Sequence, residues 1–243
     1  MSFSEYLNGV QELLKTAQAQ AETVQTVARE LAQRIRNGRV IHVFGPSHAG
    51  LMVQDLFYRA GGLVPIEPLL PAGLMLNEKP ITRTTHLEQL PGYAQTLLQD
   101  SGLRDGDALL IASVSGRNPI VTELCQVAQQ RGVTVIALTS LAYSRQVTAR
   151  HGTKRLFELA DHVLDLPGEP GDASLQLPGL SQAVGPTSTA VGSAILQGLM
   201  VQVSAELLQM GVEPPVFCSA NLDDGQEKNR RWLEHYQAKL SYL

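Results

Sequence analysis

Two continuous apolar runs with a helical segment between them restrict the fold of this chain more than any other feature. The runs are "DALLIASV" (107–114) and "VTVIALTS" (133–140), and neither alternates between apolar and polar residues. Strands of this kind lie in parallel sheets that helices cover on both faces. The intervening segment "PIVTELCQVAQQRG" (119–132) opens with a proline, which suits the first turn of a helix. The pattern predicts an α/β fold.

The remaining elements extend this pattern to a five-stranded sheet. Further strands are expected in "RVIHVF" (39–44), "LVPIEPLL" (63–70) and "HVLDLP" (162–167). Further helices are expected at 2–37, 51–62, 87–99, 187–210 and from about residue 226. We therefore expect a doubly wound parallel sheet in a single domain over 1–243. It would comprise a long N-terminal helix (1–37), an α/β core (38–210) and a C-terminal helical extension (211–243).

Composition excludes several classes of partner. The net charge of −4 gives no general attraction for nucleic acid. The N-terminus lacks the charged-then-apolar pattern of a signal peptide, and Gln197, Gln202 and Glu206 interrupt the most apolar stretch, so no membrane span is expected. Two cysteines, Cys125 and Cys218, are too few for a disulfide framework. We expect a cytoplasmic protein.

The loop "VFGPSHAG" (43–50) follows the first expected strand and resembles a nucleotide-binding loop only in part. Gly45 and Gly50 have P-loop spacing, but leucine and methionine follow where lysine and serine or threonine are needed. The dinucleotide fingerprint requires glycine where Ser47 stands. That fingerprint is weakened, although Glu67 on the next strand could still hold a ribose.

A second loop, "SVSGRN" (113–118), follows a buried strand and leads directly into a helix. It gathers Ser113, Ser115, Gly116 and Asn118 where the backbone N–H groups of a helix N-terminus favour an anion. Such a loop suits a phosphate monoester. The alternative is an ordinary turn in which Asn118 is the N-cap. A third loop, "AVGPTSTAVGSA" (183–194), starts another helix, with one of its three consecutive hydroxyl residues as cap and the others free to face a ligand.

These loops resemble those of the sugar isomerase (SIS) domain, a doubly wound phosphosugar-binding fold. The chain is similar, nearly end to end, to a bacterial family of SIS-domain proteins often described as phosphoheptose isomerases. The segments that carry this resemblance are "LFYRAGGLVP", "SGRN", "IALTS", "GDAS", "VGPTST" and "PPVFCSANLDDGQEKN". The resemblance implies that Ser113, Ser115 and Asn118 bind phosphate and that Thr187 and Ser188 complete the pocket. It also implies dimers with sites near the interface. We expect a homodimer or homotetramer that requires no metal or organic cofactor.

The chain departs from the family in two places. SIS proteins usually have Gly-x-Gly-x-Ser in the first loop, whereas this chain has Gly45-Pro46-Ser47-His48-Ala49. Ser47 would supply the missing hydroxyl from a shifted position, or the loop binds phosphate less well. Phosphoheptose isomerases carry a catalytic histidine on the helix that corresponds to 187–210, and this chain has none there.

Aldose–ketose isomerisation needs a base that removes a proton next to a carbonyl and an acid that returns it. Four candidates are Glu227, Glu88, His48 and Asp55. Glu227 is the first choice because it lies in the polar segment "NLDDGQEKN", with His235 on the same helix as a partner. Glu88 could instead be a first-turn helix carboxylate, and Asp55 could lie on an exposed helix face.

Three functions remain open from the sequence. The first is an enzyme on a phosphorylated sugar, either an aldose–ketose isomerase or a related enzyme that starts with proton abstraction next to a carbonyl. The second is a non-catalytic sugar-phosphate sensor or regulatory subunit. The third is a dinucleotide-binding oxidoreductase that uses Glu67.

Overall fold

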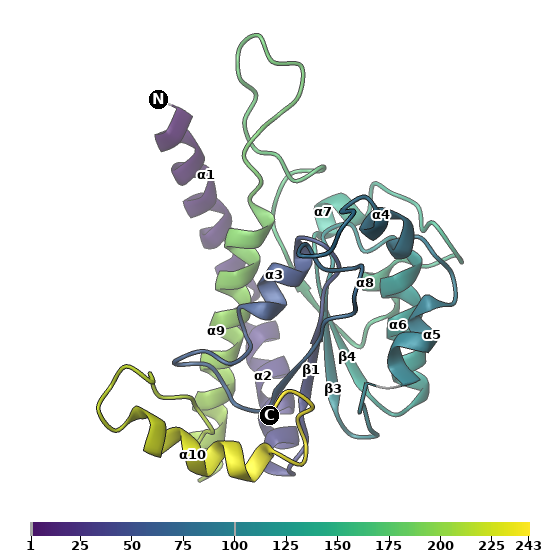
Figure 1. Ribbon diagram of the computed structural model, residues 1–243. Helices are drawn as coiled ribbons and strands as arrows, with labels where there is room; N and C mark the ends of the chain where they lie inside the picture. The colour runs from purple at the N-terminus through teal and green to yellow at the C-terminus, as the bar shows by residue number, and fades with distance from the viewer. Residues whose placement is uncertain (1, 100) are drawn as a thin grey trace.

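The computed structural model describes residues 2–99 and 101–243, and its centre is a parallel sheet (Figure 1). The strand order is β2-β1-β3-β4-β5, and every pairing is parallel. The strands are β1 (Ile41–Phe44), β2 (Ile66–Leu69), β3 (Ala108–Ala112), β4 (Thr134–Thr139) and β5 (His162–Asp165). The predicted doubly wound five-stranded sheet is therefore confirmed. Its strand order reverses between β1 and β3, where ligands bind in open α/β sheets.

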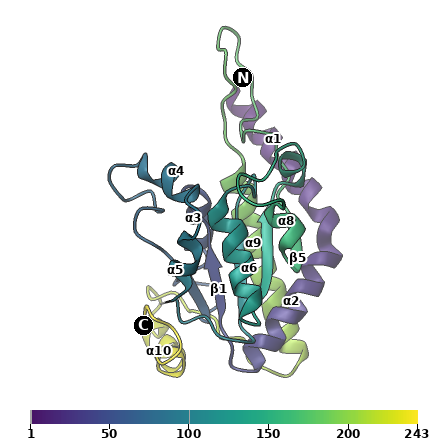
Figure 2. The same cartoon turned by 90° about the vertical axis from the view of Figure 1, so that its right-hand side faces the viewer.

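Alternate residues of each central strand enter two different cores, as expected for strands buried on both faces. Ile41 and Val43 point into a core with α2 (Ala21–Arg36), α3 (Ala49–Gln54) and α9 (Ser188–Gln209). Phe44 on the same strand enters the core on the other face. That second core lies against α5 (Tyr93–Gln99), α6 (Pro119–Gln130) and α8 (Leu156–Leu159). Figure 1 shows the sheet between these two helical layers, and Figure 2 views the same molecule from the side of α5 and α6.

The expected single N-terminal helix is interrupted. Helix α1 (Ser2–Ala17) and α2 are separated by a 3₁₀ turn at Gln18–Gln20. The turn places the Gln20 amide beside edge strand β5, where Nε2 donates to the carbonyl of Asp165 and Oε1 accepts from its N–H, both at 2.8 Å. The break therefore lets a side chain satisfy the backbone of the sheet edge.

Two other helix predictions were too long. The expected helix at 87–99 is divided into α4 (Arg83–Glu88) and α5, because Gly92 adopts a positive φ of 82° between them. Helix α3 ends at Gln54 instead of continuing to the glycines at 61 and 62, and Tyr58 has a φ of 45°. Both boundaries expose loops that the sequence pattern had assigned to helix.

Helix α9 is the long apolar helix of the core. Among the described residues it alone is long and apolar enough to cross a membrane, with a mean hydropathy of 1.4. Here it packs along α2, and its buried Glu206 lies 3.6 Å from Arg29 of that helix and accepts from Gln202. Those polar partners fit a helix inside a folded core.

The C-terminal extension lies at the amino ends of the strands, opposite the loops that precede α6 and α9 (Figure 1). It contains α10 (Gly225–Tyr236) and the segment after it. Tyr236 and Leu240 pack with Val40, the residue before β1, and with Val64. The expected helical extension is thus present. The short α7 (Leu141–Ser144) follows β4 at the other end of the sheet.

Candidate functional site

A pocket of about 260 Å³ lies at the carboxyl ends of β1 and β3, at the point where the strand order reverses. It brings together the first loop, the "SVSGRN" loop, the end of α4, α7 and the loop before α9. The lining residues are Pro46, Ser47, His48, Ala49, Glu88, Ser113, Val114, Ser115, Asn118, Tyr143, Gly171 and Asp172. Seven of the eleven residues that the sequence analysis proposed lie in this pocket or, for Gly116, within its loop.

The first loop presents Ser47 and His48 side by side. Ser47 has a positive φ of 54°, and its N–H donates to the carbonyl of Leu74 at 2.8 Å, which fixes the turn. Its Oγ lies 3.4 Å from Nδ1 of His48, whose side chain is exposed. A hydroxyl from a position shifted relative to the usual family serine therefore does line the pocket.

Close packing and hydrogen bonds fix the backbone of the "SVSGRN" loop. Gly116 has a φ of 58°, and a Cβ there would lie 3.0 Å from Oγ1 of Thr139 and 3.1 Å from Cβ of Leu156. Its N–H donates to Oγ of Ser113 at 3.3 Å, and Oγ of Ser144 donates to the carbonyl of Ser115 at 2.8 Å. Only glycine fits this turn, which leaves the Ser115 side chain lining the pocket.

Asn118 stands at the N-cap position of α6, but its side chain makes no capping hydrogen bond. Instead, Nδ2 donates to Oε2 of Glu88 at 2.8 Å, and Oδ1 is buried without a partner among the described residues. The alternative interpretation is therefore confirmed in one respect: Asn118 is the N-cap residue of α6, although its side chain does not cap the helix. Its amide is turned toward a carboxylate and carries one unused acceptor, which a ligand hydroxyl could satisfy.

Glu88 is the last residue of α4, so the expectation of a first-turn helix carboxylate is wrong. Burial raises the pKa of Glu88 above the ordinary glutamate value, and the Asn118 hydrogen bond and the nearby Arg150 charge offset this only in part. The carboxylate is half-buried at the rim of the phosphate-suited loop. A carboxyl group with a raised pKa can both accept and return a proton near neutral pH.

Thr187 and Ser188 lie at the N-terminus of α9, where they are buried and do not line the pocket. Asp172 occupies their donors: Oδ1 accepts from the N–H groups of both, at 3.1 and 2.8 Å, and Oδ2 accepts from Oγ of Ser188 at 2.5 Å. Asp172 lines the pocket in their place. Sequence reasoning missed it, and its one signal was the "GDAS" segment.

Comparisons with known proteins identify the family of this chain. A family model described as the SIS domain matches residues 5–140. The chain belongs to the SIS domain family. A UPF0309 protein of Shouchella clausii is 43% identical over 100% of both chains, and one of Oceanobacillus iheyensis is 41% identical over 98% of both. The predicted family is thus confirmed.

Solved structures share this SIS fold at low sequence identity. A phosphoheptose isomerase from Francisella tularensis is 16% identical, with a TM-score of 0.52 over 86% of this chain and 97% of that chain. A phosphoheptose isomerase from Neisseria gonorrhoeae is 17% identical, with a TM-score of 0.50 over 86% of this chain and 95% of that chain. At these identities the likeness shows the fold alone.

The other acidic candidates do not reach the pocket of this SIS domain within one chain. Glu227 is exposed on α10 at the far end of the sheet, where Oε1 accepts from Nη2 of Arg230 at 2.6 Å. His235 lies on the same helix and packs edge-to-face against Tyr236. Asp55 ends α3, pairs with Arg59, and accepts from Nε2 of Gln197 on α9 at 2.9 Å. Each is held by contacts other than those of the pocket.

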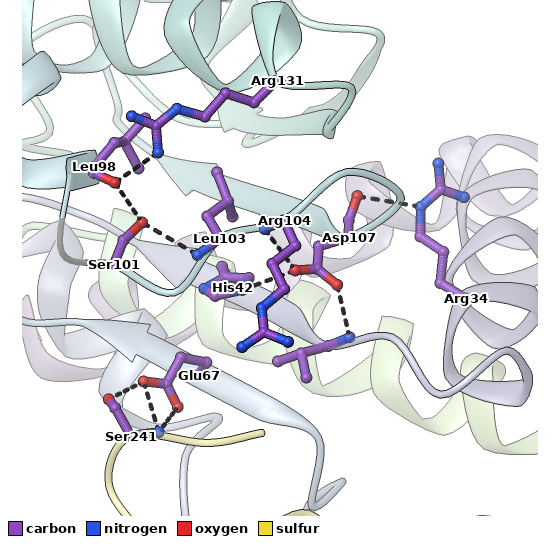
Figure 3. A network of polar contacts seen from close by, with 11 residues as sticks. Arg34, His42, Glu67, Leu98, Ser101, Leu103, Arg104, Asp107, Arg131 and Ser241 are labelled. Carbon is purple, nitrogen blue, oxygen red and sulfur yellow. Dashed lines mark hydrogen bonds and ion pairs between the residues drawn. The ribbon is translucent and has the colours of Figure 1, made fainter. Parts of the chain in front are cut away.

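Glu67 cannot serve as a free ribose ligand in this SIS domain. It lies near the start of β2 and not at its carboxyl end, and it is buried. Its carboxylate accepts from both the N–H and the hydroxyl of Ser241 in the C-terminal segment (Figure 3). The geometry therefore does not support the oxidoreductase alternative. No group of three or more His, Cys, Asp and Glu side chains within the described ranges could hold a metal ion.

Proposed function

We propose that the pocket at the carboxyl ends of β1 and β3 binds the phosphate group of a sugar phosphate. Three hydroxyls, from Ser47, Ser113 and Ser115, surround the N-terminus of α6. The first N–H groups of a helix have no acceptor within the helix, and they favour an anion together with the helix dipole. A phosphate ester offers three oxygens to such donors. Membership of the SIS family supports the same ligand class.

We further propose that the bound sugar undergoes proton transfer next to its carbonyl, as in aldose–ketose isomerisation, with Glu88 as base and then acid. One observation carries this proposal: the 2.8 Å hydrogen bond from Asn118 that holds Glu88 beside the phosphate loop. Burial already raises the pKa of Glu88 toward the working range of a general acid–base group. His48, Tyr143 and Asp172 are further titratable groups that line the pocket, and His48 is the exposed one beside Ser47.

A second candidate is a sugar-phosphate sensor that uses the same pocket without turnover. It is favoured by the absence of histidine from α9, where phosphoheptose isomerases carry one. The α9 N-terminus is also already occupied by the Asp172 carboxylate. A sensor needs the phosphate donors and no base.

Two measurements on the full chain separate these functions. Thermal unfolding is followed with a panel of aldose and ketose phosphates and with the matching free sugars. A ligand at about a hundred times its Kd adds roughly 2.7 kcal/mol of stability, so only the phosphorylated sugars should raise Tm. Deuterium uptake from solvent at the carbonyl carbon or its neighbour in a stabilising sugar identifies an enzyme, and stabilisation without uptake identifies a sensor. Equal stabilisation by free sugars contradicts the phosphate site.

We also propose that the protein acts as a homodimer or homotetramer through α1 and α9. No residue of α1 is buried, and Phe3 and Leu7 are 74% and 42% exposed. A groove of about 510 Å³ runs between the α1–α2 junction and α9, lined mainly by apolar or small residues such as Leu14, Val24 and Ile195. Phe3→Ser with Leu7→Ser should shift sedimentation at micromolar concentration toward the monomer. A monomeric parent protein contradicts the proposal.

A further inference from the structure

A second, smaller cavity lies at the amino ends of β1 and β3, at the opposite end of the sheet from the sugar-phosphate pocket. It has a volume of about 80 Å³. Figure 3 shows part of it, with Arg104 beside His42 and Asp107. The lining residues are Gly38, Arg39, Val40, His42, Gly102, Arg104, Asp107 and Lys239.

Positive charge dominates this lining. Arg39, Arg104 and Lys239 contribute three cations, and no described carboxylate lies within ion-pair distance of any of them. The one carboxylate in the lining, Asp107, is already engaged by the N–H groups of Val40 and Arg104 at 3.3 and 2.9 Å. In a chain of net charge −4, this is a local excess of cations that have no ion-pair partner among the described residues, although Nζ of Lys239 also lies 5.3 Å from the centre of the Tyr236 ring.

The backbone leaves room for two of the cationic side chains. Gly38 has a φ of 74°, and a Cβ there would lie 3.2 Å from Nζ of Lys239. Gly106 has a φ of 81°, and a Cβ there would lie 3.1 Å from Nε of Arg39. Both turns favour glycine for their conformation, and its missing side chain lets each cation lie against the turn.

His42 supplies an observation that is independent of the surface charges. Its side chain is 3% exposed, and Nε2 lies 3.4 Å from Oδ2 of Asp107. Its other nitrogen, Nδ1, is buried and has no hydrogen-bond partner among the described residues. Glu67 is its register neighbour on β2, but the carboxylate of Glu67 is taken by Ser241. Unsatisfied buried polar atoms are rare in native proteins and call for an explanation. With Nε2 paired to Asp107, a His42 ring that carries both protons has Nδ1–H as an unused donor, which an anion can accept from.

We propose that this cavity is a second anion site, which binds one phosphate group. About 10–15 Å³ of cavity volume on this measure already holds one water molecule, so the cavity has room for a tetrahedral oxyanion. The group is inorganic phosphate or the terminal phosphate of a larger molecule that remains outside. Arginine and lysine are the usual partners of such a group.

The bound anion would join two parts of the chain. Arg39 and Arg104 belong to loops of the α/β core, whereas Lys239 belongs to the segment after α10. That segment is otherwise fixed by Leu240 against Val40 and by Ser241 on Glu67. Phosphate would therefore clamp the C-terminal extension onto the amino ends of the strands.

Amide hydrogen exchange of the full chain tests this inference, with inorganic phosphate against chloride at equal ionic strength. We expect phosphate to slow exchange in residues 38–42, 101–107 and 236–241. Arg104→Gln and Lys239→Gln should each raise the apparent Kd for this protection about tenfold, the effect of losing one charge-assisted hydrogen bond. Lys15→Gln removes an exposed cation on α1 and should change nothing. Residues 113–118 report the sugar-phosphate pocket separately.

A second arm uses glucose 6-phosphate, which distinguishes the source of the phosphate group. Protection at the three segments by glucose 6-phosphate and not by inorganic phosphate supports a site for the terminal phosphate of a larger ligand. No protection by either probe overturns the proposal. Unchanged protection in both Arg104→Gln and Lys239→Gln also overturns it. Both side chains are exposed, so the variants should melt like the parent protein.

Discussion

The two ends of the sheet hold their carboxylates in opposite ways. Glu88, at the carboxyl ends of the strands, receives one side-chain amide bond, and burial raises its pKa. Asp107, at the amino ends, is also buried, which alone would raise its pKa, but bonds from His42 and from the N–H groups of Arg104 and Val40 lower the pKa below the ordinary aspartate value. At neutral pH the charged carboxylate of Glu88 therefore lowers the stability of the folded state, and that of Asp107 raises it.

This difference follows from the direction of the backbone at each end. Before β3 the chain turns tightly, so two backbone N–H groups converge on Asp107 and stabilise its charge. After β3 the loop lines the pocket with Ser113 and Ser115, and Glu88 approaches from α4 with Asn118 as its one hydrogen-bond donor among the described residues. A carboxylate with few hydrogen-bond donors is suited to proton transfer, whereas a carboxylate that accepts several hydrogen bonds is suited to fixing a turn.

The largest expected effect comes from Glu88→Gln at the carboxyl end. If Glu88 transfers the proton, turnover of the sugar phosphate should fall by roughly 10²–10⁴-fold, the usual contribution of general acid–base catalysis. Binding should change little, because the amide keeps the shape and one oxygen for Asn118. Deuterium uptake at the substrate carbon measures the first, and the ligand-induced rise in Tm measures the second.

Glu227→Gln is the matched control for that comparison. Its side chain is exposed at the far end of the sheet, so turnover should equal that of the parent protein. Loss of turnover in Glu227→Gln with normal turnover in Glu88→Gln would place the base on α10, reached through a second subunit.

The next effect in size is expected at the amino end, from Asp107→Asn. The amide keeps the shape but replaces one acceptor oxygen by a donor, so at least one of Val40 N–H, Arg104 N–H or His42 loses its partner. A buried donor left unmatched costs about 1–3 kcal/mol, and we expect the free energy of unfolding to fall by roughly 2 kcal/mol. Urea unfolding at pH 7 measures this. A change below about 0.5 kcal/mol would remove the contrast between the two ends.

Protonation of Asp107 at low pH should lower the stability of the parent protein in the same way as Asp107→Asn does. The folded-state pKa of Asp107 is below the unfolded value of about 3.9, so its contribution is present above that pH and is lost as pH falls through the folded pKa. Melting curves of the parent and of Asp107→Asn should therefore converge below about pH 4. Curves that remain parallel down to pH 2.5 would contradict the cited bonds.

Ser115→Ala should have a smaller effect, confined to ligand affinity. It removes one hydroxyl that lines the phosphate pocket while the backbone of the loop stays held by Ser144. A hydrogen bond to a charged group is worth roughly 1.5–3 kcal/mol, so the Kd for a sugar phosphate should rise about ten- to a hundredfold. Titration calorimetry measures the change. Ser101→Ala, at the other end of the sheet, should leave the Kd unaltered.

The sequence predicts the sheet and the phosphate loop because both depend on local pattern. Continuous apolar runs identify β3 and β4, and hydroxyls before Pro119 identify the loop. The predicted helix boundaries were wrong at Gly92, where a positive φ interrupts the helix although the helical sequence pattern continues. The break in the N-terminal helix at Gln20 could not be predicted for another reason. The partner of Gln20 is the backbone of Asp165, which lies 145 positions away in the sequence.

The acidic residues show the same limit. Glu227 was predicted to be the base because its sequence neighbours are polar, but the fold places α10 at the end of the sheet away from the pocket. Asp172 was not predicted as a site residue, because its role depends on the hydrogen bonds that it accepts from Thr187 and Ser188. The amino-end cavity likewise joins Arg39, Arg104 and Lys239, which no motif links. Such sites depend on long-range contacts that composition and periodicity do not encode.

The smallest expected effect sharpens the opening contrast through the stability of Glu88→Gln. The folded-state pKa of Glu88 is raised, so between the unfolded value of about 4.3 and the folded value the folded state binds more protons, and stability falls as pH rises. Above both values the parent carries the full cost of a half-buried charge, which the amide does not carry. Glu88→Gln should therefore melt slightly higher than the parent at pH 7, by no more than about 2 °C. The difference should vanish near pH 4, where the parent carboxyl is protonated in the folded state. A variant that melts lower than the parent at pH 7 would show that Asn118 and Arg150 stabilise the charge by more than burial penalises it. The two ends of the sheet would then hold their carboxylates alike.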